Sequence, residues 1–217
     1  SFPTRRSSDL GLLLCGITYL VPHGFFYSSH ALRKHDAPPS FFLQMPFWRF
    51  YGRLCARLDR IFAEFAGTHI DAEVLLIDPG SGIPSGRERD AYRQLHETLM
   101  SLHIDYLVVD TDILEQGSIR DGRFEIRDIR ARAVIVPCMP VMEKELTAQL
   151  DAFESSGGIV LRCDAPLDRD ALAAELDRHV SPRLLPVGPE EVTKNVWIVS
   201  RTDSSHASRT WFVLNTG

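Results

Sequence analysis

The most apolar run of the chain lies near its start, where residues 12–21 are LLLCGITYLV. An almost unbroken run of this kind is typical of a strand that is buried on both faces in a parallel sheet. The run ends at Pro22, and His23, three aromatic residues and a polar loop follow it. Parallel sheets bind their ligands at the carboxyl ends of the strands. We therefore expect a substrate to be bound where this predicted strand ends.

The next segment combines a long loop with an amphipathic helix. The loop over residues 28–42 is polar and contains two adjacent prolines, Pro38 and Pro39, which stiffen its return. From Pro46 onward apolar residues recur every three or four positions, with arginines on the opposite face, and Gly67 is suited to end the helix. The apolar positions are Phe47, Phe50, Tyr51, Leu54, Leu58, Ile61, Phe62 and Phe65.

From residue 72 onward, short apolar runs alternate with amphipathic stretches. The pattern predicts strands over 73–77, 106–109, 133–136 and 159–161, and helices over 87–102, 142–153 and 167–179. Strands that alternate with helices favour a parallel sheet covered on both faces. Gly122, between Asp121 and Arg123, is expected to turn a small hairpin before the third main strand.

The last part of the chain is rich in β-formers. Residues 192–200 and 210–215 predict two strands, which the turn-forming residues 203–208 separate. An isolated hairpin is marginally stable in water. We therefore expect these strands to be the first hairpin of a larger β-domain.

Composition narrows the class of protein. The chain has 217 residues, of which 44% are hydrophobic, so that it can bury a genuine core. Its net charge of -5 is spread without basic blocks, which argues against a nucleic-acid partner. The apolar run near the start is short for a membrane span. We expect neither nucleic acid nor a membrane as a partner, and the oligomeric state stays open.

Two features leave the cellular compartment open. The four cysteines are far apart and form no C-x-x-C pair, which is typical of buried thiols. The pair Arg5–Arg6 ahead of an apolar run resembles an export signal only poorly. Residues 1–10, SFPTRRSSDL, resemble the translated read of a sequencing adapter, and we exclude them from the prediction of the fold. A periplasmic or secreted parent protein is one option.

Histidines and acids gather in the loop that follows the first predicted strand. His23, His30, His35 and Asp36 lie close together, but their spacing matches no zinc-binding pattern, and we expect no metal. The favoured role for His23 is hydrogen bonding to a polar ligand at the end of the strand. An ordinary surface or core histidine is the alternative.

Two further patterns in the α/β part imitate known sites. Glycines at 80, 82 and 86 follow a predicted strand, and Asp110 ends the next one, as in dinucleotide-binding folds. The glycine spacing is wrong, however, and Pro84 interrupts it, so a connecting loop is the favoured interpretation. Cys138 follows a strand where glutamine amidotransferases carry a nucleophile, but its proline neighbours exclude the required glycine-rich elbow. We expect no cofactor.

The segments GITYLVPHGFFYS, RKHDAPPSFF and MPFWRFYGRLCARLDRIF resemble the last barrel strand, loop and helix of bacterial glycoside hydrolases similar to α-L-rhamnosidases. The segments HIDYLVVDTDIL, GRFEI and WFVLNTG continue the resemblance. It implies an α/β fold in three parts. These are the end of a (β/α)8 barrel over 11–70, a flavodoxin-like, amidotransferase-like domain over 71–181, and the first hairpin of a β-sandwich over 182–217.

The resemblance also implies a function, namely the hydrolysis of glycosidic bonds in a polysaccharide or oligosaccharide. It places five residues at a sugar subsite: His23, Phe25, Tyr27, His35 and Asp36. Tyr27 and Trp48 are candidates to stack on sugar faces, although Trp48 fits equally well in the core beside its helix. The competing prediction is a nucleotide-binding or regulatory α/β module without hydrolase activity.

The catalytic carboxyl groups are not expected in this segment. Glycosidic cleavage ordinarily uses two carboxyl groups about 5 to 10 Å apart. Between Gly11 and Ala63 the chain has no Glu, and its only Asp residues are Asp36 and Asp59. Asp59 lies on the predicted helix, so no acid/base pair can be assigned. We expect the pair to lie upstream, and this part of the enzyme to be inactive alone.

Overall fold

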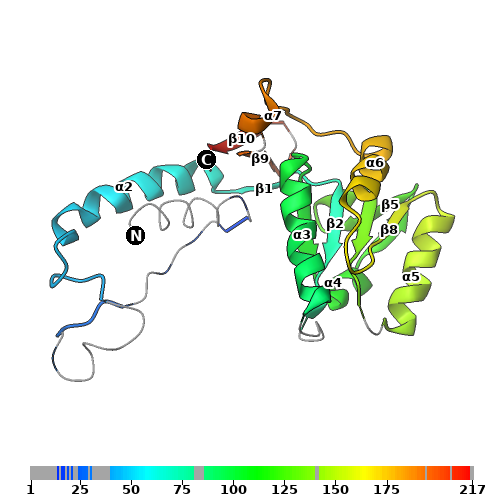
Figure 1. The fold of residues 1–217 in the computed structure, drawn as a ribbon, viewed down its shortest axis with the longest axis horizontal. Coiled ribbons are helices and arrows are strands. Elements are labelled where there is room, and N and C mark those ends of the chain that lie inside the picture. Colours follow the sequence, from blue (N-terminus) through cyan, green and yellow to red (C-terminus); the bar gives the residue numbers. More distant parts are fainter. Residues whose placement is uncertain are drawn as a thin grey trace. The chain divides into compact units, whose positions relative to one another are not determined.

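The structure, a computed structural model, forms two compact units (Figure 1). The first unit comprises residues 15–67, and the second comprises chiefly residues 68–217. The described residues are 14, 16, 17, 19, 21, 24–28, 30, 40–80, 86–139, 142–193, 195–205 and 207–215.

The unit 15–67 is built on one helix, α2 (Trp48–Phe65). Its position agrees with the helix predicted from Pro46. Among its apolar residues only Phe65 is buried, whereas the side chains of Phe50 and Leu54 are 47% and 39% exposed. In the described part of the chain, no helix has the length and apolar character that crossing a bilayer requires.

The strand predicted over 12–21 is wrong for the residues of that stretch that the structure describes. Leu14 is helical, while Ile17, Tyr19 and Val21 belong to no strand. The side chains of Tyr19 and Val21 are 79% and 77% exposed, and a strand buried on both faces would hide them. Apolar character alone predicts burial but does not supply the neighbouring strands that a sheet needs.

The second unit is organised around a four-stranded parallel sheet, as the alternating pattern predicted. Its strands lie in the order β3 (Tyr106–Val109), β2 (Val74–Ile77), β7 (Ala133–Val136) and β8 (Ile159–Arg162). Every residue of β2 and β7 is buried, because both strands are central and covered on both faces. The fold is therefore mixed α/β.

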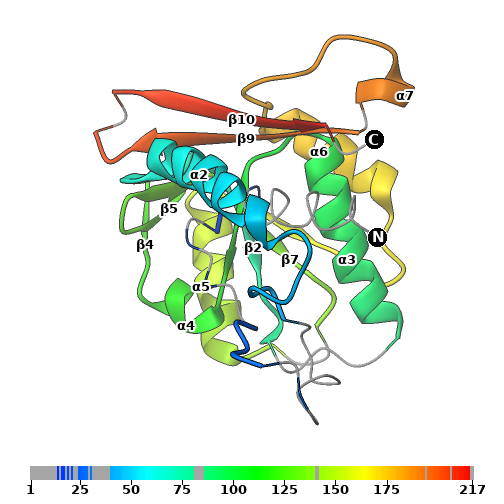
Figure 2. The ribbon, with the colours of Figure 1, turned by 90° about the vertical axis from the view of Figure 1, so that its left-hand side faces the viewer.

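Helices cover both faces of the parallel sheet (Figure 2). On one face lie α3 (Arg87–Ser101) and α6 (Arg169–His179), whose leucines pack against the sheet. The opposite face carries α5 (Lys144–Ser155) and the short α4 (Thr111–Glu115). Each helix of three or more turns was predicted from its apolar spacing, whereas α4 has too few residues to show such a period.

A small antiparallel sheet completes the second face. It consists of β4 (Ser118–Arg120), β5 (Arg123–Ile126) and β6 (Ile129–Ala131), in that order. Gly122 turns the first hairpin with a φ of 68°, a conformation that favours glycine, as predicted. Phe124 of β5 is fully buried against Phe153 of α5, so the sheet closes the core on this side.

A second antiparallel sheet lies in the same unit. It has the order β1 (Thr68–Ile70), β9 (Val196–Asp203) and β10 (Arg209–Asn215), and the short helix α7 (Glu190–Thr193) precedes β9. The predicted C-terminal hairpin is thus present, and β1, which was not predicted, pairs with it through residues far away in the chain. Whether the hairpin opens a larger β-domain stays a prediction.

Gly158, at the entry to β8, offers a direct test of core packing. A Cβ atom at this position would lie 2.2 Å from the ring of Phe153, which is fully buried. We expect Gly158→Ala to lower the free energy of unfolding by about 1–3 kcal/mol, because the ring must shift. Urea denaturation measures this change. In the control Gly52→Ala, on α2, no atom lies within 4 Å, and unchanged or higher stability is expected.

Candidate functional site

The predicted sugar subsite falls on both described and undescribed parts of the chain. His23, His35 and Asp36 lie outside the described residues, so their predicted role stays a prediction. Phe25 and Tyr27 are described, and both belong to the unit 15–67.

Phe25 lies at the centre of an aromatic cluster, which we define as Phe25, Tyr27, Phe42, Trp48 and Tyr51. The ring of Phe25 meets the rings of Phe42, Trp48 and Tyr51 edge-on, with centroids 5.9, 6.0 and 5.6 Å away. Trp48 and Tyr51 stack on each other with centroids 5.3 Å apart. Edge-on and offset contacts of this kind are favourable for aromatic pairs. The cluster therefore joins the segment around Phe25 to the start of α2.

Tyr27 lies at the margin of this cluster and is its most accessible member. Its side chain is 90% exposed, and its ring centroid is 6.4 Å from that of Phe42. Nearby, the Gln44 side-chain amide donates to the Phe26 carbonyl at 2.9 Å, which anchors the backbone beside Tyr27. The cluster thus combines an anchored backbone with an exposed aromatic ring, an arrangement suited to stacking on a flat apolar ligand face.

A second concentration of chemistry lies in the other unit, around Asp71, between β1 and β2. Arg183 donates from Nη2 to Asp71 Oδ1 at 3.2 Å, and its Nε lies 3.1 Å from Oδ2. Arg209 of β10 donates from Nε to Asp71 Oδ2 at 2.7 Å. The carboxylate is nearly buried, with a side-chain exposure of 10%. Two arginines from distant parts of the chain therefore neutralise one buried charge.

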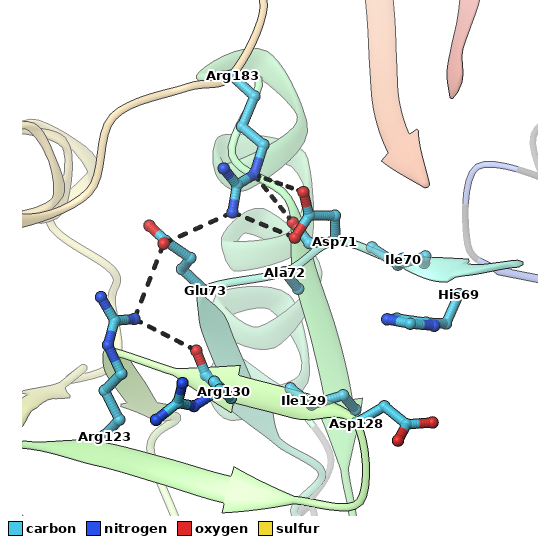
Figure 3. A pocket seen from close by; sticks show the side chains of 10 residues that line it. All are labelled: His69, Ile70, Asp71, Ala72, Glu73, Arg123, Asp128, Ile129, Arg130 and Arg183. Carbon is cyan, nitrogen blue, oxygen red and sulfur yellow. Dashed lines mark hydrogen bonds and ion pairs between the residues drawn. The ribbon is translucent and has the colours of Figure 1, made fainter. Parts of the chain in front are cut away.

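The ion pairs continue into a charged cavity (Figure 3). Glu73 Oε1 lies 3.5 Å from Arg183 Nη2 and 3.8 Å from Arg123 Nη1, so it connects the Asp71 pair to the β4–β6 sheet. The cavity has a volume of about 270 Å³. It is lined by His69, Ile70, Asp71, Ala72, Glu73, Arg123, Asp128, Ile129, Arg130 and Arg183. Because acids and arginines balance along its wall, the cavity has no strong preference for either sign of charge.

Asp105 extends the same polar network toward β9. Its carboxylate accepts hydrogen bonds from the Ser200 N–H at 2.9 Å and from the Ser200 hydroxyl. The Ser200 carbonyl in turn accepts from the Asp71 N–H at 3.0 Å. Burial raises the pKa of Asp105 to about 6, and the charge of Asp71 acts in the same direction, against the Ser200 hydrogen bonds and Arg183. Ser200 thus connects the Asp105 carboxylate to the backbone of Asp71.

The cavity lies at the amino end of β2, whereas parallel sheets bind ligands at the carboxyl ends of their strands.

At the carboxyl ends of the parallel strands, the Asp110 side chain accepts a hydrogen bond from the Asp112 N–H at 3.0 Å and so caps α4. This contact gives Asp110 a structural role at the start of α4, and a nucleotide-binding role for the segment stays a prediction. Most of the glycine loop, residues 81–85, lies outside the described residues. No group of residues suited to a metal ion occurs in the described part.

A third polar group involves α3 and β3. His96 Nδ1 lies 2.8 Å from the Tyr106 hydroxyl, and the ring of Tyr92 meets the His96 ring edge-on. Burial, helped by the charge of Asp78, raises the pKa of Tyr92 to about 12, and burial lowers the pKa of His96. Both rings are therefore neutral at pH 7, which fits packing at the edge of β3 better than proton transfer.

Comparisons with known proteins leave the family open, since no family model and no curated protein matches the chain. The sequence singled out Phe25 and Tyr27, whose role in binding stays a prediction, but it did not reveal the Asp71 network. Its partners Arg183 and Arg209 lie 112 and 138 positions away in the chain, and no local pattern links them.

Replacing Asp71 tests whether the network stabilises the fold. Asp71→Asn removes the charge that neutralises Arg183 and Arg209, and we expect a loss of up to about 3–5 kcal/mol in the free energy of unfolding. Urea denaturation at pH 7 measures the loss. Glu97→Gln is the control, because its pair with Arg93 at 2.8 Å is exposed and contributes less than about 1 kcal/mol. Equal effects of the two substitutions would contradict a structural role for Asp71.

The raised pKa of Asp105 predicts that the stability of the fold depends on pH. Its pKa in the folded state is raised from 3.8 to about 6, so between these values the folded state binds more protons than the unfolded state. Its contribution to stability therefore falls as the pH rises from 4 to 7. We expect the difference in unfolding free energy between the wild type and Asp105→Asn to fall by about 1–3 kcal/mol over this range.

The measurement is urea denaturation at several pH values, with Asp177→Asn, an exposed carboxylate on α6, as the control variant. A constant difference between the wild type and Asp105→Asn over the whole range would show that Asp105 does not titrate in this way.

Proposed function

We propose that the chain is part of a glycoside hydrolase that cleaves glycosidic bonds in an oligosaccharide or polysaccharide, with α-L-rhamnosides as the first substrate class to test. The aromatic cluster carries this proposal. Sugar rings present flat faces of C–H groups, and these pack on aromatic rings. Tyr27 is 90% exposed and provides such a ring, and the Gln44 side chain holds the carbonyl of the neighbouring Phe26.

The surface of α2 supports the assignment of this helix to the end of a barrel, although the described residues of 12–21 do not form the expected barrel strand. In a (β/α)8 barrel, each outer helix lays its apolar stripe against the barrel strands. In the described residues the corresponding stripe of α2, including Tyr51, Leu58, Ile61 and Phe62, is only half-buried. The other strands and helices of a barrel would cover this stripe.

The parallel sheet supports the assignment of residues 71–181 to a flavodoxin-like domain. In chain order its strands are arranged 2-1-3-4, which is how the flavodoxin-like sheet begins. We propose that the domain has no amidotransferase chemistry, because Pro137 precedes Cys138 and excludes the nucleophile elbow. Its role in the parent enzyme is then to support the barrel.

The outer face of β10 supports a further β-layer. Exposed and half-buried residues alternate along the strand, and Trp211 and Val213 on the outer face are 44% and 52% exposed. A β-sandwich domain would cover these apolar side chains with a second sheet.

The carboxylates of the unit 15–67 are consistent with a segment that binds a sugar but does not cleave it. Among the described residues of the unit 15–67, the carboxylates are Asp59 and Glu64, and both are exposed on α2. Neither lies in the aromatic cluster. We propose that the acid/base pair belongs to another part of the parent enzyme, and that this chain holds one wall of the sugar subsite.

Binding and turnover of sugars test the proposal together. We expect a rhamnose-containing oligosaccharide to give saturation-transfer NMR signals with the 217-residue chain and no hydrolysis of aryl α-L-rhamnosides. Tyr27→Ala should weaken binding by about 2- to 10-fold, since one aromatic contact is lost. Tyr19→Ala removes an equally accessible tyrosine, 79% exposed, and should leave binding unchanged.

Two outcomes would contradict the proposal in different ways. Turnover of an aryl glycoside by this chain would show that the carboxyl pair is present after all. Absence of binding to any of a panel of oligosaccharides, or equal binding by the Tyr27 and Tyr19 variants, would remove the sugar subsite itself.

A further inference from the structure

The strand β8 forms one edge of the parallel sheet in the described part of the chain. It pairs with β7 on one side, through Ala133 to Val136. No described strand pairs with its other side. An edge strand of this kind presents unpaired N–H and C=O groups, to which another extended segment can add.

The hydrogen bonds to β7 determine which groups of β8 point outward. The N–H groups of Ile159 and Cys163 donate to the carbonyls of Arg132 and Val136, at 3.1 and 2.9 Å. Because peptide groups alternate along a strand, Val160 and Arg162 direct their N–H and C=O groups away from β7. These two residues therefore offer two donors and two acceptors at the edge.

This edge is the floor of a groove. The helices α5 and α6 lie on opposite faces of the sheet (Figure 2). The groove has a volume of about 800 Å³. It is lined by Glu154 of α5, by the whole of β8 and by several residues of α6. It is thus long enough to receive an extended segment along β8, with one helix on either side.

The walls of the groove are acidic. Glu154 lies on the α5 side, while Asp164, Asp168 and Glu175 lie after β8 and on α6. The single arginine of the lining is Arg162, and it is already paired, since its Nη2 lies 3.1 Å from Glu154 and 3.7 Å from Asp151. Glu175 is paired as well, since its Oε1 lies 2.6 Å from Arg178 Nη1. The lining still carries more carboxylates than arginines, and Asp164 and Asp168, after β8, account for the excess of negative charge.

We propose that the β8 edge binds an extended peptide segment rich in lysine or arginine, which adds to the sheet as a further strand. Side chains of an added strand alternate between the two faces. Basic side chains would meet Asp164 and Asp168, whereas at Glu154 and Glu175 they would compete with Arg162 and Arg178. A second copy of this chain fits less well, because pairing β8 with β8 would bring two acidic grooves together.

The probe is a fluorescein-labelled peptide of alternating lysine and valine residues, titrated into the 217-residue protein and followed by fluorescence anisotropy. The matched control peptide has the same sequence with N-methyl groups on alternate residues. It keeps the charge but cannot donate hydrogen bonds along one edge. We expect at least about tenfold weaker binding of this control, because backbone hydrogen bonds are lost. A glutamate–valine peptide should not bind.

Two variants of the protein locate the site. Val160→Pro removes an outward N–H and adds a ring at the edge, and proline is tolerated on edge strands because no bond to β7 is lost. It should also weaken binding by about tenfold, with circular dichroism as a check on folding. Asp164→Asn should weaken binding a few-fold, whereas Glu97→Gln on α3, which does not line the groove, should leave it unchanged.

Four results would overturn the proposal. They are the absence of binding by the lysine–valine peptide, equal binding of the N-methylated peptide, equal binding of the glutamate–valine peptide, and a protein dimer that Val160→Pro dissociates. The last result would make a second copy of the chain the occupant of the groove. Since the N-methylated peptide is tested on the unchanged protein, the conclusion does not depend on the folding of any variant.

Discussion

The buried carboxylate of Asp71 is the interaction on which the larger unit depends. It lies in the short link between β1 of the antiparallel sheet and β2 of the parallel sheet, and it pairs with Arg183 and Arg209. A charge removed from water costs several kcal/mol unless it is paired and hydrogen-bonded. The fold meets this requirement by bringing β10 and the connection after α6 to the same carboxylate, which determines where the C-terminal hairpin packs.

The need to pair the buried carboxylate of Asp71 also explains the charged cavity beside it. Its arginines and carboxylates already neutralise one another, and Asp105 shares the network through Ser200. The cavity lies at the amino end of β2, away from the edge at which parallel sheets bind their ligands. Its chemistry is thus that of a structural junction, whereas the aromatic cluster and the β8 edge have groups still available for a ligand: an exposed ring in the first, unpaired peptide groups in the second.

Elements with a long or regular spacing of apolar residues were predicted well from the sequence. Helix α2 and the strands β3 and β7 lie where the apolar spacing placed them, and Gly122 turns the predicted hairpin. The strand over residues 12–21 failed in the described positions, because an apolar run indicates burial and not the partner that provides it. Short elements such as β1 and α4 were missed, since three to five residues cannot show a period.

The features of the candidate site also divide into those that the sequence shows and those that depend on the tertiary structure. By itself the sequence determined that aromatic residues gather after Gly24, that helices alternate with strands beyond residue 72, and that residues 11–63 contain two Asp and no Glu. Only the tertiary structure decided that Asp71 meets Arg183 and Arg209, and that Val160 lies on a strand at the edge of the parallel sheet in the described part of the chain. Periodicity is a local property that a sequence displays directly. Ion pairs and sheet edges depend on residues that are distant in the chain, and these become neighbours only when the whole unit packs.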